Sequence, residues 1–244
     1  MTALLPASAR LAWWGTAWLR GHVVTDLLID AVLAGDATHA VAGLPGAAGT
    51  ETLVAALGRL RTAGATALGA AFPVDGDPVG LGGPLAFNVA ALESGEAAVV
   101  LGTGLGLVPV RVGAALTWTA HPAERRQLPD VGEADRALRG ALIESADVLA
   151  RLEVARWRPE VADRLMNLRH REPVAAPPGV PARCVELAAR GLQALEIADL
   201  ALEDDGGAVS AHEIAQRRGA LVPLERAGRR ALVAACSPEV WPPG

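Results

Sequence analysis

The spacing of apolar side chains predicts that the chain begins with two helices. Leu11, Trp14 and Trp18 follow the i, i+3, i+7 spacing of one helical face, which predicts a helix over about residues 6–20. A similar spacing of apolar residues predicts a second helix over about residues 25–33. Both helices carry one apolar face, so we expect them to pack against a sheet or another helix.

The pattern then changes to short apolar runs that alternate with a helix. Residues 39–44 and 65–74 have the length and composition of strands, and residues 50–63 between them have helical periodicity. A strand, a helix and a second strand in this order form a crossover unit, which predicts two parallel strands in one sheet.

Three more apolar runs extend the predicted sheet. Residues 97–101 and 105–112 are joined by a Gly-Thr-Gly turn at 102–104, which predicts a hairpin, and a further strand is expected over 116–120. A short helix is expected over about 85–93. The first half of the chain therefore predicts a mixed α+β fold, with a small mixed sheet of four or five strands and flanking helices.

The second half of the chain has helical periodicity almost throughout. The Pro-rich stretch 172–181 is the best candidate for a linker. We therefore expect an α/β region over 1–120 and a mostly helical region over 121–244, either as two units or as one compact domain. The predicted helices cover about residues 133–156, 159–169, 182–203, 210–219 and 223–235.

Composition narrows the chemistry that this chain can perform. All 22 basic residues are Arg, and there is neither Lys nor Tyr. This excludes Schiff-base chemistry, the lysine of a phosphate-binding loop and a Tyr general base. The net charge of −5 lacks the basic excess of a nucleic-acid-binding protein, so we do not expect a nucleic-acid partner.

Cysteine usage and hydropathy predict the compartment. Two Cys in 244 residues do not form a disulfide framework, which favours a reducing environment. No basic n-region precedes an apolar stretch at the start, and no apolar run reaches the ~20 residues of a bilayer span. We therefore expect a soluble cytoplasmic protein with no membrane partner.

The first candidate binding site is a glycine-rich loop between the predicted strand 39–44 and the predicted helix 50–63. Gly43, Gly46, Gly49 and Thr50 lie where parallel sheets bind ligands, next to the N–H groups of a helix N-terminus. This position predicts a site for an anionic small molecule or a nucleotide. The glycines match no known phosphate-binding fingerprint, and an ordinary turn in which Thr50 caps the helix is the alternative.

The second candidate is a pair of acidic residues after the predicted strand 65–74. Asp75 and Asp77 would lie at the same sheet edge as the glycine loop if the two strands were parallel neighbours. An Asp-x-Asp pair can hold a divalent cation, whereas a solvated turn needs the same residues for its geometry alone. We include both residues in the predicted ligand site.

Nothing else in the sequence assembles a catalytic or metal site. The five His residues have no metal-ligand spacing, and His39 within an apolar strand is better explained as a hydrogen-bonded core or edge residue. Cys184 follows Pro181 in the first turn of a helix, but no His or Asp partner can be assigned, so we expect a buried structural thiol. We assign no catalytic residue, metal or cofactor, and leave open whether the chain is an enzyme.

Two functions remain from the sequence. One is a non-enzymatic interaction or regulatory protein that forms a homodimer, with Trp13 as a candidate for the subunit contact because interface cores are rich in Trp. The alternative is a protein or enzyme that binds an anionic small molecule at the Gly43–Thr50 loop.

Overall fold

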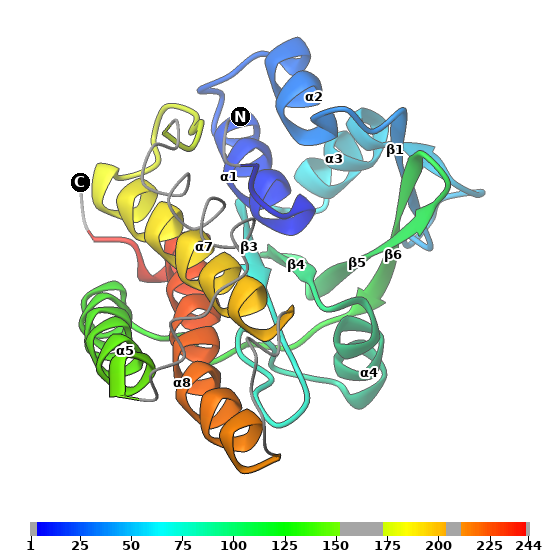
Figure 1. Ribbon diagram of the computed structural model, residues 1–244. Helices are drawn as coiled ribbons and strands as arrows, with labels where there is room; N and C mark the ends of the chain where they lie inside the picture. The colour runs from blue at the N-terminus through cyan, green and yellow to red at the C-terminus, as the bar shows by residue number, and fades with distance from the viewer. Residues whose placement is uncertain (1–3, 152–172, 204–210, 243–244) are drawn as a thin grey trace.

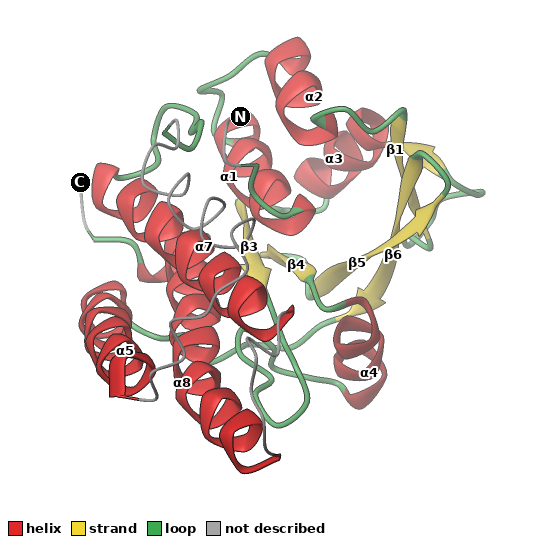
Figure 2. Cartoon of the chain, in the orientation of Figure 1, coloured by secondary structure: helices red, strands yellow, loops and turns green. Residues whose placement is uncertain are grey.

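The computed structural model describes residues 4–151, 173–203 and 211–242. They form one six-stranded mixed sheet, helices on both of its faces, and a helical layer from the second half of the chain (Figures 1 and 2). The predicted mixed α+β fold is confirmed, with six strands instead of four or five. The predicted helix 159–169 lies outside the described residues. The described helices are α1 (Ala7–Leu19), α2 (Thr25–Leu33), α3 (Leu53–Thr62), α4 (Leu85–Ser94), α5 (Val131–Arg151), α7 (Ala182–Glu203) and α8 (Ala211–Ala235), followed by a short 3-10 helix, η2 (Pro238–Val240).

The sheet has the order β2-β1-β6-β5-β4-β3. Strands β3 to β6 form an antiparallel meander, while β1 pairs in parallel with β6 and antiparallel with the short β2. The predicted parallel pairing of the first strand with β3 is wrong, because three strands separate them and they run in opposite directions. The strands are β1 (Thr38–Ala42), β2 (Glu51–Thr52), β3 (Ala67–Ala71), β4 (Ala97–Leu101), β5 (Leu105–Val112) and β6 (Ala115–Pro122).

Helices α1 and α4 pack on opposite faces of the sheet. Gly15 of α1 lies against Leu68 of β3, on the face that also carries Leu107 and Trp118. The ring of Phe87 in α4 lies over Gly106 on the other face, where a side chain would overlap the ring. The α1 face holds the larger core, which continues into α7 and α8.

The outer edge of β3 is closed by hydrogen bonds from two helices. The Thr16 hydroxyl accepts from the Leu68 N–H at 2.9 Å and donates to the Leu68 carbonyl at 3.1 Å. The Ala70 N–H donates to the carbonyl of Cys236 at 3.0 Å. These contacts satisfy groups that would otherwise pair with a strand of another molecule.

The C-terminal helices attach to the sheet through a buried arginine. Every N–H of the Arg126 guanidinium is used: it donates to the carbonyls of Ala70 and Gly80, the Ser237 hydroxyl and the Glu239 carboxylate. Burial lowers the pKa of Arg126, and Glu239 opposes that shift. A groove of about 900 Å³ lies beside Arg126, but all its guanidinium donors are already bonded within the protein.

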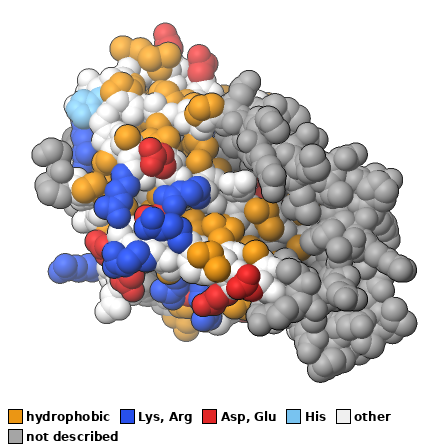
Figure 3. Space-filling view, turned by 60° about the vertical axis from the view of Figure 1, so that its left-hand side comes forward, with side chains coloured by type: hydrophobic (Ala, Val, Ile, Leu, Met, Phe, Trp, Pro, Cys, Tyr) orange, Lys and Arg blue, Asp and Glu red, His pale blue; other side chains and the backbone are white. Residues whose placement is uncertain are grey.

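The helical face carries charges of both signs. When the α5 and α7 side is turned toward the viewer, basic side chains lie among acidic and hydrophobic ones (Figure 3). Asp135, for example, lies 2.8 Å from Arg139 and 2.6 Å from Arg190. Within the described part of the chain, no helix is both long and apolar enough to cross a bilayer.

Two predictions about particular helices need correction. Trp13 is fully buried and donates through Nε1 to the Ala235 carbonyl at 3.0 Å, so it packs α1 against the end of α8 and is not available for a subunit contact. The two helices predicted over 210–219 and 223–235 are the single helix α8, with Pro223 inside it.

Candidate functional site

A cavity that could bind a small molecule lies where β4 separates from β5. The β4–β5 pairing ends at Leu107, and beyond it the Ser94 hydroxyl donates to the Pro109 carbonyl at 2.8 Å. A cavity of about 430 Å³ opens there between the C-terminal end of α4 and strands β5 and β6. Its size is typical of small-molecule sites. We call it the β5 pocket; its lining residues are Ala90, Glu93, Ser94, Glu96, Val108, Pro109, Val110, Arg111, Leu116, Thr119 and His121.

Glu96 is the most deeply placed acid of the β5 pocket. It precedes β4, and its Oε2 accepts from the backbone N–H of Ser8 at 2.8 Å, in the first turn of α1. Among the described residues, Ser8 is the only hydrogen-bonding partner of this carboxylate, which leaves Oε1 for a bound molecule. Burial raises the pKa of Glu96, against the opposing effects of Ser8, Arg10 and Arg111.

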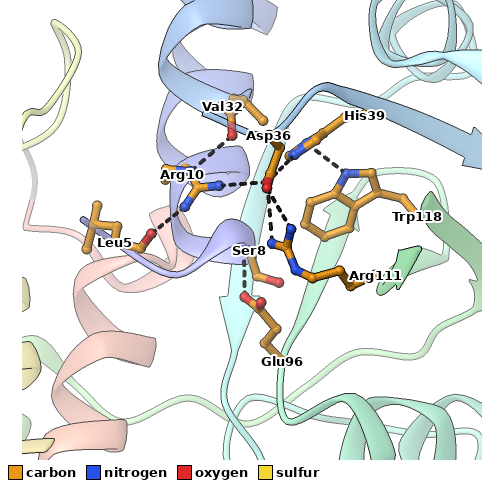
Figure 4. Close-up of polar contacts among 9 residues, drawn as sticks. All are labelled: Leu5, Ser8, Arg10, Val32, Asp36, His39, Glu96, Arg111 and Trp118. Carbon is orange, nitrogen blue, oxygen red and sulfur yellow. Dashed lines mark hydrogen bonds and ion pairs between the residues drawn. The ribbon is translucent and has the colours of Figure 1, made fainter. Parts of the chain in front are cut away.

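Asp36 contacts two arginines and a histidine beside the pocket (Figure 4). It follows the left-handed turn at Ala34 that ends α2. Its carboxylate accepts from Arg111 Nη1 at 2.6 Å and from His39 Nε2 at 2.9 Å, and lies 3.6 Å from Arg10 Nη2. Hydrogen bonds from Arg111 and then His39 lower the pKa of Asp36 to about 2. Asp36 therefore holds Arg111 by its charge at the pocket wall.

His39 is part of this cluster but cannot act on a bound molecule. Its ring is fully buried; Nε2 faces Asp36, and Nδ1 accepts from Trp118 Nε1 at 3.3 Å (Figure 4). This bonding assigns the neutral tautomer with the proton on Nε2. Burial lowers the pKa of His39, which agrees with a neutral ring. The prediction of a hydrogen-bonded core histidine is confirmed.

Family comparisons extend over nearly the whole chain. The family described as "Rv1486c-like protein, N-terminal domain" matches residues 8–132, and the one described as "Rv1486c-like protein, C-terminal domain" matches residues 132–233. The chain belongs to the Rv1486c-like family.

Two relatives in this family come from Mycobacterium tuberculosis. "Uncharacterized protein Rv1486c" of strain ATCC 25618 / H37Rv is 30% identical over 292 aligned residues, which cover 96% of this chain and 98% of the relative. "Uncharacterized protein MT1533" of strain CDC 1551 / Oshkosh has the same identity and coverage. No solved structure matches the chain.

In this Rv1486c-like chain none of the glycine-loop residues lines the β5 pocket. Gly43, Gly46, Gly49 and Thr50 are all exposed, in the segment between β1 and β2. The cap of α3 is Thr52 instead of Thr50, since its hydroxyl accepts from the Ala55 N–H. Glu51 is paired with Arg59, so an acid and its partner already lie beside this helix N-terminus. Ligand binding by the loop stays a prediction.

The two predicted aspartates are not brought to that loop. Asp75 is exposed, whereas Asp77 is buried and lies 3.0 Å from Arg230 and 3.5 Å from Arg226. The expectation of a solvated turn is therefore wrong for Asp77, whose carboxylate attaches its loop to α8. Among the residues that the structure describes, no group of three or more His, Cys, Asp or Glu side chains could hold a metal ion.

Sequence reasoning missed the β5 pocket and the charge cluster beside it because their charged residues come from separate elements. Arg10 is in α1, Asp36 follows α2, Glu96 precedes β4 and Arg111 is in β5. The one local signal was His39, because an imidazole at a buried strand position needs a polar partner and Asp36 lies three residues before it.

Proposed function

We propose that this protein binds a small amine-bearing molecule with a short apolar body in the β5 pocket. The observation that carries the proposal is Glu96, a half-buried carboxylate in the pocket wall with one oxygen left free by the described residues. A protonated amine would donate to this oxygen and offset the cost of burying the charge.

The charges around the pocket favour an amine over an anion. The cation in the wall, Arg111, already lies against Asp36 at 2.6 Å. Glu93 and Glu96 have no cation within ion-pair distance among the described residues. An ammonium group between these two acids would supply the missing charge, whereas a carboxylate there would be repelled by both.

The rest of the pocket wall suits a short hydrocarbon. Ala90, Val108, Val110 and Leu116 provide apolar contact, and Thr119 and His121 add polar groups at the β6 side. Small-molecule sites commonly combine apolar walls with a few polar groups that orient the ligand.

From the sequence we also propose that the protein has an interaction or regulatory role and that it is located in the cytoplasm. The free, buried thiols of Cys184 and Cys236 support a reducing compartment. The amine site is compatible with a regulatory role, in which occupancy of the pocket would change what the protein binds.

Isothermal titration with 1,4-diaminobutane, using sodium butyrate as the anionic probe, tests the proposal. We expect the diamine to bind and butyrate not to bind. Glu96→Gln keeps an oxygen to accept from the Ser8 N–H but removes the charge, so we expect at least a ~10-fold loss of diamine affinity. Glu133→Gln on the exposed surface of α5 is the matched control, and its affinity should equal that of the wild type.

Arg111→Gln distinguishes the two signs of ligand charge. Since Arg111 is not the proposed ligand of the amine, this variant should retain diamine binding. Binding of butyrate that disappears in Arg111→Gln would show an anion site and overturn the proposal. Equal diamine affinity in the wild type and in a folded Glu96→Gln variant, or no binding of either probe, would also overturn it.

A further inference from the structure

Part of one sheet face is not covered by any described helix or loop. Helix α4 packs on this face against β5 and β6, and Val99 and Val108 are buried in the small cluster beneath it. Farther along the sheet, the strand registers place side chains of β1, β6 and β5 on the same face, and all of them are half-buried or exposed. We call this surface the open face; its central residues are Thr38, Ala40, Val110, Val112, Thr117 and Thr119.

The open face has an unusual composition for a surface in contact with water. None of its six central residues is charged, and Val110 and Val112 expose 48% and 63% of their surface. Solvated faces of antiparallel sheets normally carry polar and charged residues opposite an apolar core side. Helix α4, on the same side of the sheet, also exposes Leu85 and Val89.

We propose that the open face binds the open face of a second copy of this chain, forming a two-fold dimer. An uncharged surface complements another uncharged surface, because neither side has to give up hydration of a charge. A two-fold axis places the same patch on both subunits, so the complement is available in the chain itself. Nucleic acid and anionic membranes require basic residues, which the six central residues lack.

The size of the patch suits such a dimer. Three strands and α4 span about 25 Å, and the eight residues of β6 span about 27 Å, on the order of 600 Å² in projection. The accessible area of a corrugated surface exceeds its projection, and a standard interface buries about 800 Å² per partner. The open face shares Val110 and Thr119 with the β5 pocket, but the dimer does not require that an amine binds there.

The test is sedimentation velocity and light scattering of the full chain from about 1 μM to about 100 μM, the range that covers standard interfaces of moderate affinity. We expect a concentration-dependent dimer. Val112→Glu places a charge in the interface twice by symmetry, so we expect at least a ~100-fold increase in the dimer dissociation constant.

Val24→Glu is the matched control. Val24 precedes α2 and is 65% exposed, nearly the same as Val112, but it lies outside the open face. This variant should dimerise like the wild type. If Val112→Glu does not fold, as judged by circular dichroism, Thr117→Arg at the centre of the face takes its place. A wild-type monomer at ~100 μM, an unchanged dimer in the folded interface variant, or equal dissociation of Val24→Glu would overturn the proposal.

Discussion

Replacing Asp36 by Ala should cost the protein a substantial part of its stability, although Asp36 is not a core residue. The substitution removes the acceptor of the buried His39 Nε2–H and the ion-pair partner of Arg10 and Arg111. Arg10 retains its hydrogen bonds to backbone carbonyls at 2.7 and 3.0 Å, which limits the damage there.

The expected magnitude follows from which group is left without a partner. A buried donor without an acceptor costs about 1–3 kcal/mol, and removing one member of a buried ion pair costs about 3–5 kcal/mol. The Asp36 side chain is 14% exposed, and Arg111 can turn to water, so the lower part of the second range applies. We expect Asp36→Ala to lower the free energy of unfolding by about 3 kcal/mol, and Asp36→Asn by about 1–2 kcal/mol, since Asn keeps an acceptor.

The pH dependence tests the same contacts. Asp36 has a pKa of about 2 in the folded protein, and an Asp in an unfolded chain has about 3.9. A lowered pKa gives stability that is complete above the unfolded value and is lost as pH falls from about 4 to 2. After allowance for solvent screening this is about 1–2 kcal/mol, so the stability difference between wild type and Asp36→Asn should shrink over that interval.

Urea unfolding of the wild type and both variants at pH 7 and at acidic pH provides the measurement. Asp30→Ala, an exposed aspartate near the end of α2, is the control and should change stability by no more than about 0.5 kcal/mol. A loss below about 0.5 kcal/mol in Asp36→Ala would refute the view that Asp36 holds the cluster together. If the difference in unfolding free energy between the wild type and Asp36→Asn does not change with pH, the charge of Asp36 does not stabilise the fold.

Two further predictions concern other contacts. Gly69→Ala should destabilise the protein by about 2–4 kcal/mol in urea unfolding, because its methyl group would overlap the Arg126 guanidinium, whereas Gly58→Ala, with open space in α3, should stabilise it by about 0.5–1 kcal/mol. Burial raises the pKa of Cys184 to about 11 and that of Cys236 further, so neither thiol should react with Ellman's reagent at pH 8 until the protein is unfolded; rapid reaction of the native protein would contradict their burial.

Local patterns in the sequence predict the elements well and their partners poorly. The helices at Thr25–Leu33 and Ala182–Glu203 and the strands at 97–101 and 105–112 have the predicted bounds, because each depends on periodicity within its own segment. The pairing of β1 with β6 joins residues 38–42 to residues 115–119, a contact for which no local signal exists. The crossover rule fixes handedness only for strands already known to be parallel, so it could not detect that β1 and β3 are antiparallel and separated.

Pro223 shows how packing overrides local preference. A proline inside a helix removes one hydrogen bond and costs about 3 kcal/mol, which is why the sequence predicts a break there. Leu221 and Leu224 on either side are buried, and α8 packs against both α5 and α7. Burial of two such side chains contributes about 3–6 kcal/mol, enough to continue the helix through the proline.

The network around Asp36 connects the fold to the proposed function. Because the charge of Arg111 is paired with Asp36, Arg111 does not fully neutralise Glu96. The β5 pocket therefore keeps an acid that can pair with a ligand. In Asp36→Asn, Arg10 and Arg111 both lose their counter-charge, so their positive charges act on Glu96 without opposition. Amine affinity should then fall although Asp36 touches no ligand, while the folded variant keeps its pocket walls. The same side chain thus explains both how α1 is joined to β1 and β5 and why the pocket favours a positive charge.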